Sequence, residues 1–537
     1  MIGIQSGQLT FTQVEAWCAH LLDPSSIYGL MNRLGALWFP DEVYASMYAA
    51  GGRPSVPPGL LARALMLQRW TNEGDRELVD RIRFDLRFKY ALNVPIEYEG
   101  FDPSLLSVFR SRLMKHEKER LAFEQSLSMA RACGLLDPDE DQVGDSAPIH
   151  GAAAVQDTYT LLRTSIEKIL RALKPFEIRG FLPPFPADKY LKSRGKANIA
   201  WNDDAQKYAH LAELVEDAKA LLNIGDEVSS DEQDRPVDTR LDDGDLLRAC
   251  SVLRRIVKQD IVDTENGPRI RKGKDATSDR VISTNDPEMR HGHKTSKNLF
   301  AGYKGSITAT TREIVTSIDV IAANEPDARP VPGQVDYFQR LGLYPKRLYL
   351  DCAYGSAETR LALKERDVEV VAKVPDASHL AKHFPKASFR IQMDGTTAAQ
   401  VTCPTGKTTT AFRDAKDSKE RPVQVAQFKA EDCKDCPLRS QCTPLKKKGR
   451  EVELHHREDV LQAARQRAAE PGFREEIKTR CIVERINAQL QRHGLKAARY
   501  LGKQKTKLQA LFAGAVHNFW KAGTHARGRA VIPVPTA

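Results

Sequence analysis

The sequence predicts an α/β protein whose core is interrupted by insertions and preceded by a helical N-terminal domain. Three observations support this prediction: helical spacing of apolar residues before residue 138, strand-like runs after residue 139, and a compact β-α-β pattern at residues 347–374. The chain has 537 residues, of which 41% are hydrophobic and 28% charged, as in a folded globular protein. This length is enough for several domains or for one fold with insertions.

Residues 1–138 predict a helical domain. Apolar residues recur at helical spacing in residues 57–70 and 76–92, and two prolines mark the start of the first helix. Between these helices Gly74 breaks one helix and Asp75 can cap the next, which predicts a helix-turn-helix-like unit. A third helix at residues 104–123 carries several Arg and Lys residues. This pattern suits either a helical bundle with a solvated basic face or a domain that binds DNA ends.

The pattern changes after residue 139, where a catalytic domain is predicted to extend to residue 525. QVGDSAPIHG is a short alternating run, predicted as a single strand that Asp145 closes. Residues 155–285 are polar and helical with a loop-like end, and are predicted as an insertion. Residues 298–311 and 312–323 are β-rich runs whose separation suits an antiparallel pair.

The β-α-β pattern places Asp351 at the carboxyl end of a buried strand, where ligands and catalytic groups gather in open α/β sheets. Residues 385–468 are irregular, contain a cysteine cluster and are predicted as a second insertion. A long helix is expected from Pro471 to Arg492, followed by a final amphipathic helix and a disordered tail at residues 526–537.

Three acidic residues come from separate predicted elements: Asp145, Asp351 and Glu484. Glu484 shares one helical face with Arg480, Asn487 and Gln491. Taken alone, such a polar stripe is most often a solvated face. Two-metal phosphoryl transfer needs clustered carboxylates, because these must hold two hard cations about 4 Å apart. The three acids together therefore suggest such a site, although sequence spacing alone does not bring them together.

The formal net charge of +10 favours a polyanionic partner, with nucleic acid as the leading candidate. Basic residues concentrate in DPEMRHGHKTSKNLFAGYK, which could be a solvated loop. We favour contacts with DNA phosphates near the acidic residues, because a site that binds DNA needs cations to balance the phosphate charge. The residues expected to make these contacts are Arg290, Lys294, Lys297 and Lys304.

The nine cysteines do not form the dense, even framework of a secreted disulfide scaffold, so reduced thiols are expected. Four of them form a C…CxxCPLRxxC arrangement that can hold one structural zinc ion: Cys403, Cys433, Cys436 and Cys442. The alternative is that they are small buried packing residues, or a site that has lost its metal. The other five are expected to be packing residues.

Several motifs resemble, in order, those of the DDE transposases of bacterial insertion sequences, in the branch called IS eleven-eighty-two. They are GDSAPIHGAAAVQDTY, NDPEMRHGHKTSKNLFAGYKG, LYLDCAYGSAET and RCIVERINAQL. The helical start, including GRPSVPPGLLARALMLQRWTNEGDRELVDRIRFDLRFKYAL and FDPSLLSVFRSRL, is similar to the N-terminal domain of those enzymes. The resemblance covers nearly the whole chain.

The resemblance implies an RNase H-like catalytic core in which Asp145, Asp351 and Glu484 hold two Mg²⁺ or Mn²⁺ ions. In related enzymes an aromatic residue and an arginine precede the glutamate, and a lysine follows it. This sequence keeps the arginine as Arg480 but has Ile477 at the aromatic position, and it has Gln491, next to Arg492, at the lysine position. Arg480 and Arg492 are therefore expected to contact DNA.

The implied activity is metal-dependent cleavage at transposon ends followed by strand transfer into target DNA. The expected partners are the terminal inverted repeats, the target DNA and a second copy of the chain in the DNA complex. Two alternatives remain: an RNase H-like nuclease without strand transfer, and a transposase-derived, non-catalytic DNA-binding protein. No membrane-spanning run, signal segment or Walker loop is found, so a cytoplasmic bacterial protein without a nucleotide cofactor, nucleoid-associated when bound to DNA, is expected.

Overall fold

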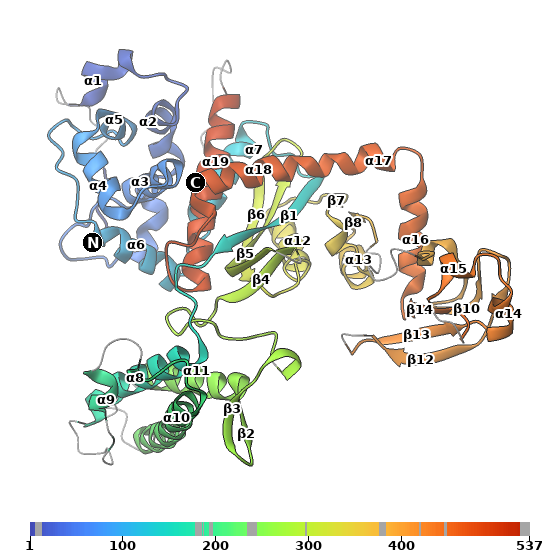
Figure 1. Ribbon diagram of the computed structural model, residues 1–537. Coiled ribbons are helices and arrows are strands. Elements are labelled where there is room, and N and C mark those ends of the chain that lie inside the picture. Colours follow the sequence, from blue (N-terminus) through green and yellow to red (C-terminus); the bar gives the residue numbers. More distant parts are fainter. Residues whose placement is uncertain are drawn as a thin grey trace.

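A computed structural model of the chain (Figure 1) has a central mixed sheet, a helical N-terminal region and two inserted modules. The structure describes residues 1–5, 13–177, 185, 187–192, 197–233, 244–275, 277–295, 298–374, 383–417, 420–444 and 448–526. Among these residues, no helix is long and apolar enough to cross a membrane.

The N-terminal region is helical, as predicted. Its helices are α1 (Val14–Cys18), α2 (Ile27–Trp38), α3 (Pro58–Thr71), α4 (Asp75–Phe84), α5 (Leu86–Ala91), α6 (Ser104–Lys115) and α7 (Leu121–Ala132). The start of α3 at a proline is confirmed. The helix predicted at residues 76–92 is instead broken at Asp85, whose carboxylate accepts a hydrogen bond from the Arg87 backbone N–H and so caps α5. The third predicted helix is likewise two helices, α6 and α7.

The predicted strands form one sheet. Its strands are β1 (Gln142–His150), β4 (Arg290–Thr295), β5 (Asn298–Thr310), β6 (Val315–Ala322), β7 (Arg347–Tyr349) and β8 (Glu369–Val371). The order is β4-β5-β1-β7-β8, with β6 also pairing with β5. Strands β6, β5 and β1 are antiparallel, whereas β1, β7 and β8 are parallel. The antiparallel pair and the β-α-β unit predicted from the sequence are both confirmed.

The catalytic region contains further helices outside the two insertions. They are α12 (Val331–Arg340), α13 (Ala357–Lys364), α16 (Glu458–Ala469), α17 (Phe473–Glu476), α18 (Cys481–Leu490) and α19 (Lys503–His525). Helix α19 packs against α3, α7 and β6, and one continuous hydrophobic core runs from the N-terminal helices into the sheet (Figure 1). The single helix predicted from Pro471 to Arg492 is divided by the 3-10 turn η8 (Ile477–Arg480) and followed by the π-turn η9 (Gln491–Leu495).

The first insertion is a helical lobe with its own hydrophobic core. It contains α8 (Thr158–Glu177), α9 (Asp188–Leu191), α10 (Asp204–Gln233), α11 (Gly244–Asp260), β2 (Ile261–Thr264) and β3 (Gly267–Ile270). These helices lie in the segment that the sequence analysis describes as polar and helical. The segment expected to be a loop instead contributes β3, which pairs with β2 in a two-stranded hairpin.

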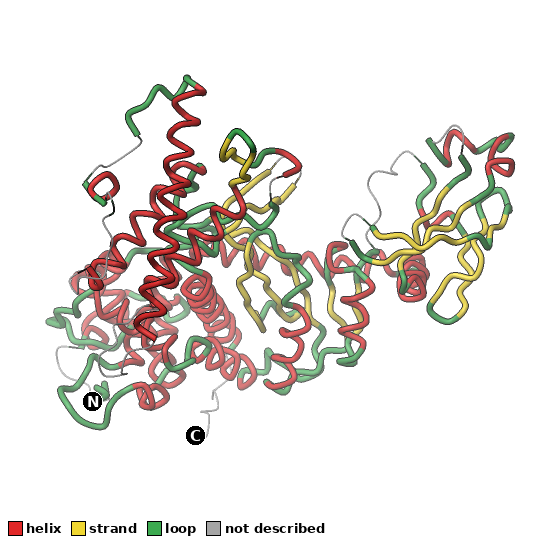
Figure 2. The backbone as a smooth tube through the Cα atoms, turned by 90° about the horizontal axis from the view of Figure 1, so that it is seen from below, coloured by secondary structure: helices red, strands yellow, loops and turns green. Residues whose placement is uncertain are grey.

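The second insertion, here called the cysteine module (residues 383–455), was predicted to be irregular, and this was wrong. It contains β9 (Arg390–Asp394), β10 (Thr397–Thr402), β11 (Thr408–Thr409), β12 (Phe412–Lys416), β13 (Pro422–Gln427), β14 (Glu451–His455), α14 (Ala430–Lys434) and α15 (Arg439–Cys442). The strands form two three-stranded antiparallel sheets. The module stands away from the central sheet and joins it through α16 (Figure 2).

Candidate acidic active site

Asp145 lies within β1 and not at its end, which corrects the sequence-based expectation. Strand β1 continues to His150 because β5 pairs with it along its whole length, and Asp145 lies opposite Ile307 of β5. On its other side β1 pairs with β7 only through Gln142 and Val143. Asp145 therefore lies just beyond the part of β1 that pairs with β7.

Asp351 follows the last residue of β7 by two positions, at the carboxyl end of that strand as predicted. Its carboxylate Oδ1 accepts a hydrogen bond from the Ala353 backbone N–H at 2.6 Å and caps the 3-10 turn η5 (Cys352–Tyr354). Strands β1 and β7 are parallel neighbours, and their register places Asp145 level with Asp351. Both aspartates therefore lie at the end of the sheet where β7 stops.

The two aspartates are close enough to affect each other electrostatically. The pKa of Asp145 is raised to about 6, first by burial and then by the negative charges of Asp351 and Asp327. The Ser146 backbone N–H and the Arg480 guanidinium act in the opposite direction. A carboxylate that is buried next to like charges gains from a cation placed beside it.

Arg480 links Asp145 to the third predicted acid. Its Nη1 lies 4.0 Å from Asp145 Oδ2, and its Nη2 lies 2.8 Å from Glu484 Oε1, one helical turn further along. Asn487 Nδ2, on the same face of α18, is 3.4 Å from Asp145 Oδ2. The structure thus brings α18 against β1, but the Glu484 side chain is 54% exposed and is paired with Arg480.

Asp327 is a site residue that the sequence analysis missed. Its Oδ1 accepts a hydrogen bond from Ser146 Oγ at 2.9 Å and is 2.7 Å from Lys304 Nζ. Tyr354 is buried near Asp327 and Asp145. Burial and the negative charges of these two aspartates raise the pKa of its hydroxyl. One signal could have pointed to Asp327: it lies in a turn shortly after the end of a strand, β6.

The chemistry of the acidic residues fits hard divalent cations, which prefer oxygen ligands. Asn487 Oδ1 is also buried beside this site without a hydrogen-bond partner, so it could accept from a metal-bound water. In the part of the chain that the structure describes, however, no three His, Cys, Asp or Glu side chains are arranged to hold a metal as they stand. Asp145 and Asp351 lie near each other, whereas Glu484 is paired with Arg480 and would have to leave it to join them.

The residues predicted to contact DNA differ in how available they are. Arg290 is 6% exposed, and its Nε lies 2.6 Å from Asp279 Oδ1, so it stabilises the fold and we do not retain it as a DNA contact. Lys304 is paired with Asp327, and Arg480 with Glu484. Two remain exposed, Lys294 on β4 and Arg492 in η9. Lys297 lies outside the described residues.

The four cysteines predicted to bind zinc line one pocket in the cysteine module. The strands of that module lie away from the central sheet (Figure 1). Of the other five cysteines, Cys133 and Cys250 are buried, as expected of packing residues, whereas Cys352 and Cys481 are exposed next to the acidic motifs.

Two family models match parts of the chain. A model described as a transposase DDE domain matches residues 402–522, which include Glu484 but not Asp145 or Asp351. A model described as a transposase domain (DUF772) matches residues 20–112, from the N-terminal helices. No curated protein and no solved structure matches the chain. The chain thus carries two transposase domain matches, which suggest a transposase role, and the DDE domain implies an RNase H-like core.

Proposed function

We propose that the protein is a DDE transposase that cleaves DNA at the ends of an insertion sequence and transfers the resulting strand into target DNA. The proposal rests on one geometric observation. Asp351 lies beside Asp145, which is 206 residues earlier in the chain, and Arg480 links Asp145 to Glu484, which lies 133 residues after Asp351. The transposase DDE domain match over the Glu484 segment supports this interpretation.

Asp145, Asp351 and Glu484 would hold two Mg²⁺ or Mn²⁺ ions. When bound, such ions supply Lewis-acid stabilisation of the phosphoryl oxygens and activate the attacking oxygen. The reaction begins with attack of water on the phosphodiester at the element's end, which frees a 3′-hydroxyl. That hydroxyl then attacks a target phosphodiester in line, forming a new P–O bond and releasing the target's own 3′-oxygen.

Arg480 has two successive roles in this proposal. Without DNA, its guanidinium offsets the negative charge of Asp145 and Glu484. When DNA enters, the phosphates compete for the guanidinium, because arginine forms strong charge-assisted hydrogen bonds with phosphate oxygens. Glu484 is then free to turn toward the aspartates, so the complete acidic triad forms only when substrate is present.

Lys304 and Asn487 keep the acidic site in shape. Lys304 holds the Asp327 carboxylate, which also accepts a hydrogen bond from Ser146, the neighbour of Asp145. Asn487 donates a hydrogen bond to Asp145 and fixes the orientation of its carboxylate. Both contacts restrict the motion of side chains around β1, which reduces the cost of organising the site for reaction.

The other parts of the chain are assigned to DNA handling. Residues 1–138 would bind the terminal inverted repeats, since their helices include the segment that matches a transposase domain. Exposed Lys294 and Arg492 would contact phosphates near the acidic site. Two copies of the chain would act together, one on each transposon end.

The decisive experiment compares the wild type with Asp351→Asn on labelled end DNA from the element's own flanks, with and without Mg²⁺. The substitution keeps the size of the side chain but removes a metal-binding charge. We expect nicking and joining to fall at least about 10³-fold, while a gel shift on the same DNA is unchanged. Asp394→Asn, an exposed aspartate on β9, is the matched control and should keep full activity.

The same assay separates the alternatives. Cleavage without joined products, on paired ends and target DNA, would identify a nuclease that lacks strand transfer. Binding without any Mg²⁺-dependent nicking would identify a non-catalytic DNA-binding protein. Near-wild-type cutting by Asp351→Asn would show that the acidic residues are wrongly assigned.

A further inference from the structure

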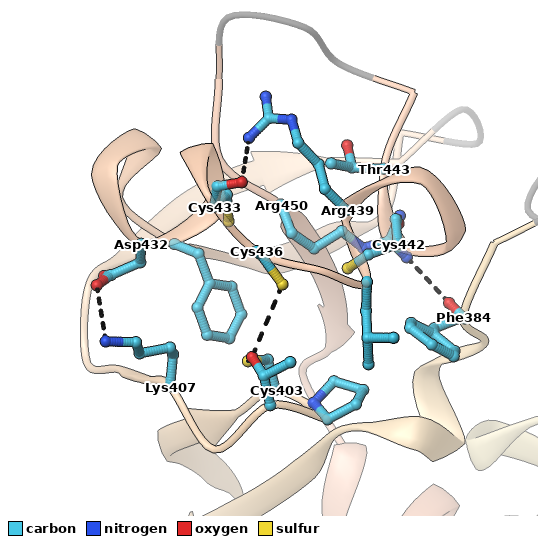
Figure 3. Close-up of a pocket in the computed structure, with 14 residues that line it drawn as sticks. Phe384, Cys403, Lys407, Asp432, Cys433, Cys436, Arg439, Cys442, Thr443 and Arg450 are labelled. Carbon is cyan, nitrogen blue, oxygen red and sulfur yellow. Dashed lines mark hydrogen bonds and ion pairs between the residues drawn. The ribbon is translucent and has the colours of Figure 1, made fainter.

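The pocket in the cysteine module collects four thiols from three separate segments (Figure 3). Cys403 follows β10, Cys433 lies in α14 with Cys436 just beyond it, and Cys442 ends α15. All four line a cavity of about 20 Å³, which has room for about one water-sized particle. We call these four residues the cysteine pocket.

The backbone around the cysteine pocket is held by hydrogen bonds on each segment. The Gly406 N–H donates to Cys403 O at 2.9 Å, in a turn where Gly406 adopts the positive φ that glycine allows. Arg439 Nη1 donates to Cys433 O at 2.6 Å, and Arg450 Nη1 donates to Cys442 O at 2.9 Å. The main chain is therefore fixed, while the sulfur atoms are left to interact inside the pocket.

Two of the four sulfur atoms share one neighbour. Cys403 Sγ and Cys436 Sγ contact the same hydroxyl, Thr405 Oγ1, at 3.1 and 4.0 Å. As they stand, no three ligating side chains among the described residues are arranged around a single point. Because the thiols share one cavity and their backbone is anchored, rotation of the cysteine side chains is the movement needed to form a tetrahedral site.

Simple packing does not account for the cysteine pocket. Cys133 and Cys250, which do act as packing residues, are 4% and 3% exposed, whereas the four pocket cysteines are each only partly buried. Their partial exposure lets an ion enter. The pocket is also lined by basic side chains that can offset the charge of thiolates, namely Lys407, Arg439 and Arg450.

The hydrophobic cluster of the cysteine module is small. Among the described residues it consists of seven buried residues: Phe389, Ala398, Val401, Ala426, Phe428, Val452 and Leu454. Cys403, Cys433 and Cys442 pack against this core as partly buried members. A small unit with so few apolar residues usually needs a disulfide, a metal or a partner to stay folded.

We propose that the cysteine pocket binds one Zn²⁺ ion through four thiolates and thereby holds the cysteine module together. Binding displaces the four thiol protons to solvent, and no oxidation or reduction takes place. This proposal does not depend on the transposase assignment, because it concerns only residues of the module.

The test measures the metal content of the full-length protein purified without chelator. We expect about one zinc per chain in the wild type and a loss of most of it in Cys436→Ser. Cys18→Ser is the matched control, because Cys18 is also partly buried but lies in α1, and it should retain zinc. Cys442→His should retain zinc as well, because imidazole can replace thiolate as a ligand.

A second measurement on the wild type alone covers the case in which Cys436→Ser does not fold. Zinc is removed with a chelator, Co²⁺ is added, and the visible absorption of a tetrahedral cobalt–thiolate site is expected at about one equivalent. The proposal is overturned if the wild type contains no zinc and gives no such spectrum with Co²⁺. Finding the pocket cysteines joined as disulfides in protein purified under reducing conditions would also overturn it.

Discussion

The acidic site and the cysteine pocket both collect side chains from separate segments of the chain, but they differ in the surroundings of those side chains. At the acidic site, Asp145 is buried beside Asp351 and Asp327, and its raised pKa records the cost of that arrangement. In the cysteine pocket three of the four thiols, those of Cys403, Cys433 and Cys442, pack against a small apolar core. At the acidic site carboxylates repel one another, whereas in the pocket partly buried thiols line a small cavity.

The two proposals, a catalytic metal site at the acidic residues and a structural metal site in the cysteine pocket, predict different consequences. A catalytic site must keep a position for substrate and must tolerate like charges that an ion later neutralises. A structural site contributes directly to the stability of the fold. Removing one ligand should therefore have opposite effects: at the acidic site the reaction is lost and the fold gains, while at the cysteine pocket the fold is weakened.

The largest effect is expected for catalysis. Glu484→Gln should reduce nicking at least about 10³-fold, equivalent to about 4 kcal/mol, because the amide cannot supply the charge that the metal ions need. Adding Asp145→Asn to it should reduce the rate little further, because residues that act as one unit are not additive. The measurement is single-turnover nicking in Mg²⁺. If the losses of the two single variants multiply in the double variant, the two residues do not share a metal centre.

The second effect concerns the fold of the cysteine module. Cys436→Ser should lower the free energy of opening of β9–β14 by roughly 3 kcal/mol, because a structural metal contributes directly to folding. Hydrogen exchange measures this opening strand by strand, which suits a large chain that need not unfold in one step. Exchange in β1 and β5 should stay unchanged. Equal protection of β9–β14 in variant and wild type would contradict the prediction.

The third effect is a gain in folding stability on substitution, whereas the second is a loss. Because the pKa of Asp145 is about 6 in the folded chain and 3.8 as its reference value, the folded state holds this proton more tightly. Folding stability without divalent metal should therefore fall as pH rises from about 4 to 6 and then level off. Asp145→Asn, which stays neutral, should be more stable than the wild type by about 3 kcal/mol well above pH 6 and no more stable below pH 4.

Thermal or denaturant unfolding in chelator, at pH 4 and pH 7.5, checks this prediction. The matched control is Asp394→Asn, an exposed aspartate whose removal should leave the pH dependence as it is. If Asp145→Asn is less stable than the wild type at pH 7.5, the carboxylate stabilises the metal-free fold and the account of its burial is wrong.

Much of the fold could be predicted because the central sheet has strong local patterns. Strands β5 and β6 are long and β-rich, and Asp351 closes a short buried strand that is followed by an amphipathic helix. The strands of the cysteine module were missed because they are short and rest on a small core. Strand β12, for example, exposes most of its residues and alternates weakly.

The candidate site was predicted less completely, because it depends on packing between distant segments. The stripe containing Arg480, Glu484 and Asn487 was identified from helical spacing, but the ion pair that holds Glu484 away from the aspartates was not. Asp327 was missed because only the pairing of β5 with β6 brings its turn next to Ser146. Local spacing reveals which residues share a face, whereas their partners come from the tertiary fold.

The smallest expected effect concerns DNA affinity and compares exposed cations near the acidic site with an exposed cation of the cysteine module. Each phosphate contact contributes about 0.9 to the slope of log affinity against log salt. Replacing both Lys294 and Arg492, which are exposed, by Ala should make that slope shallower by up to about two units. Lys416→Ala, an exposed lysine of the cysteine module, is the control and should leave the slope unchanged. Equilibrium binding to end DNA at several salt concentrations measures it, and an unchanged slope in the double variant would place this surface away from the DNA.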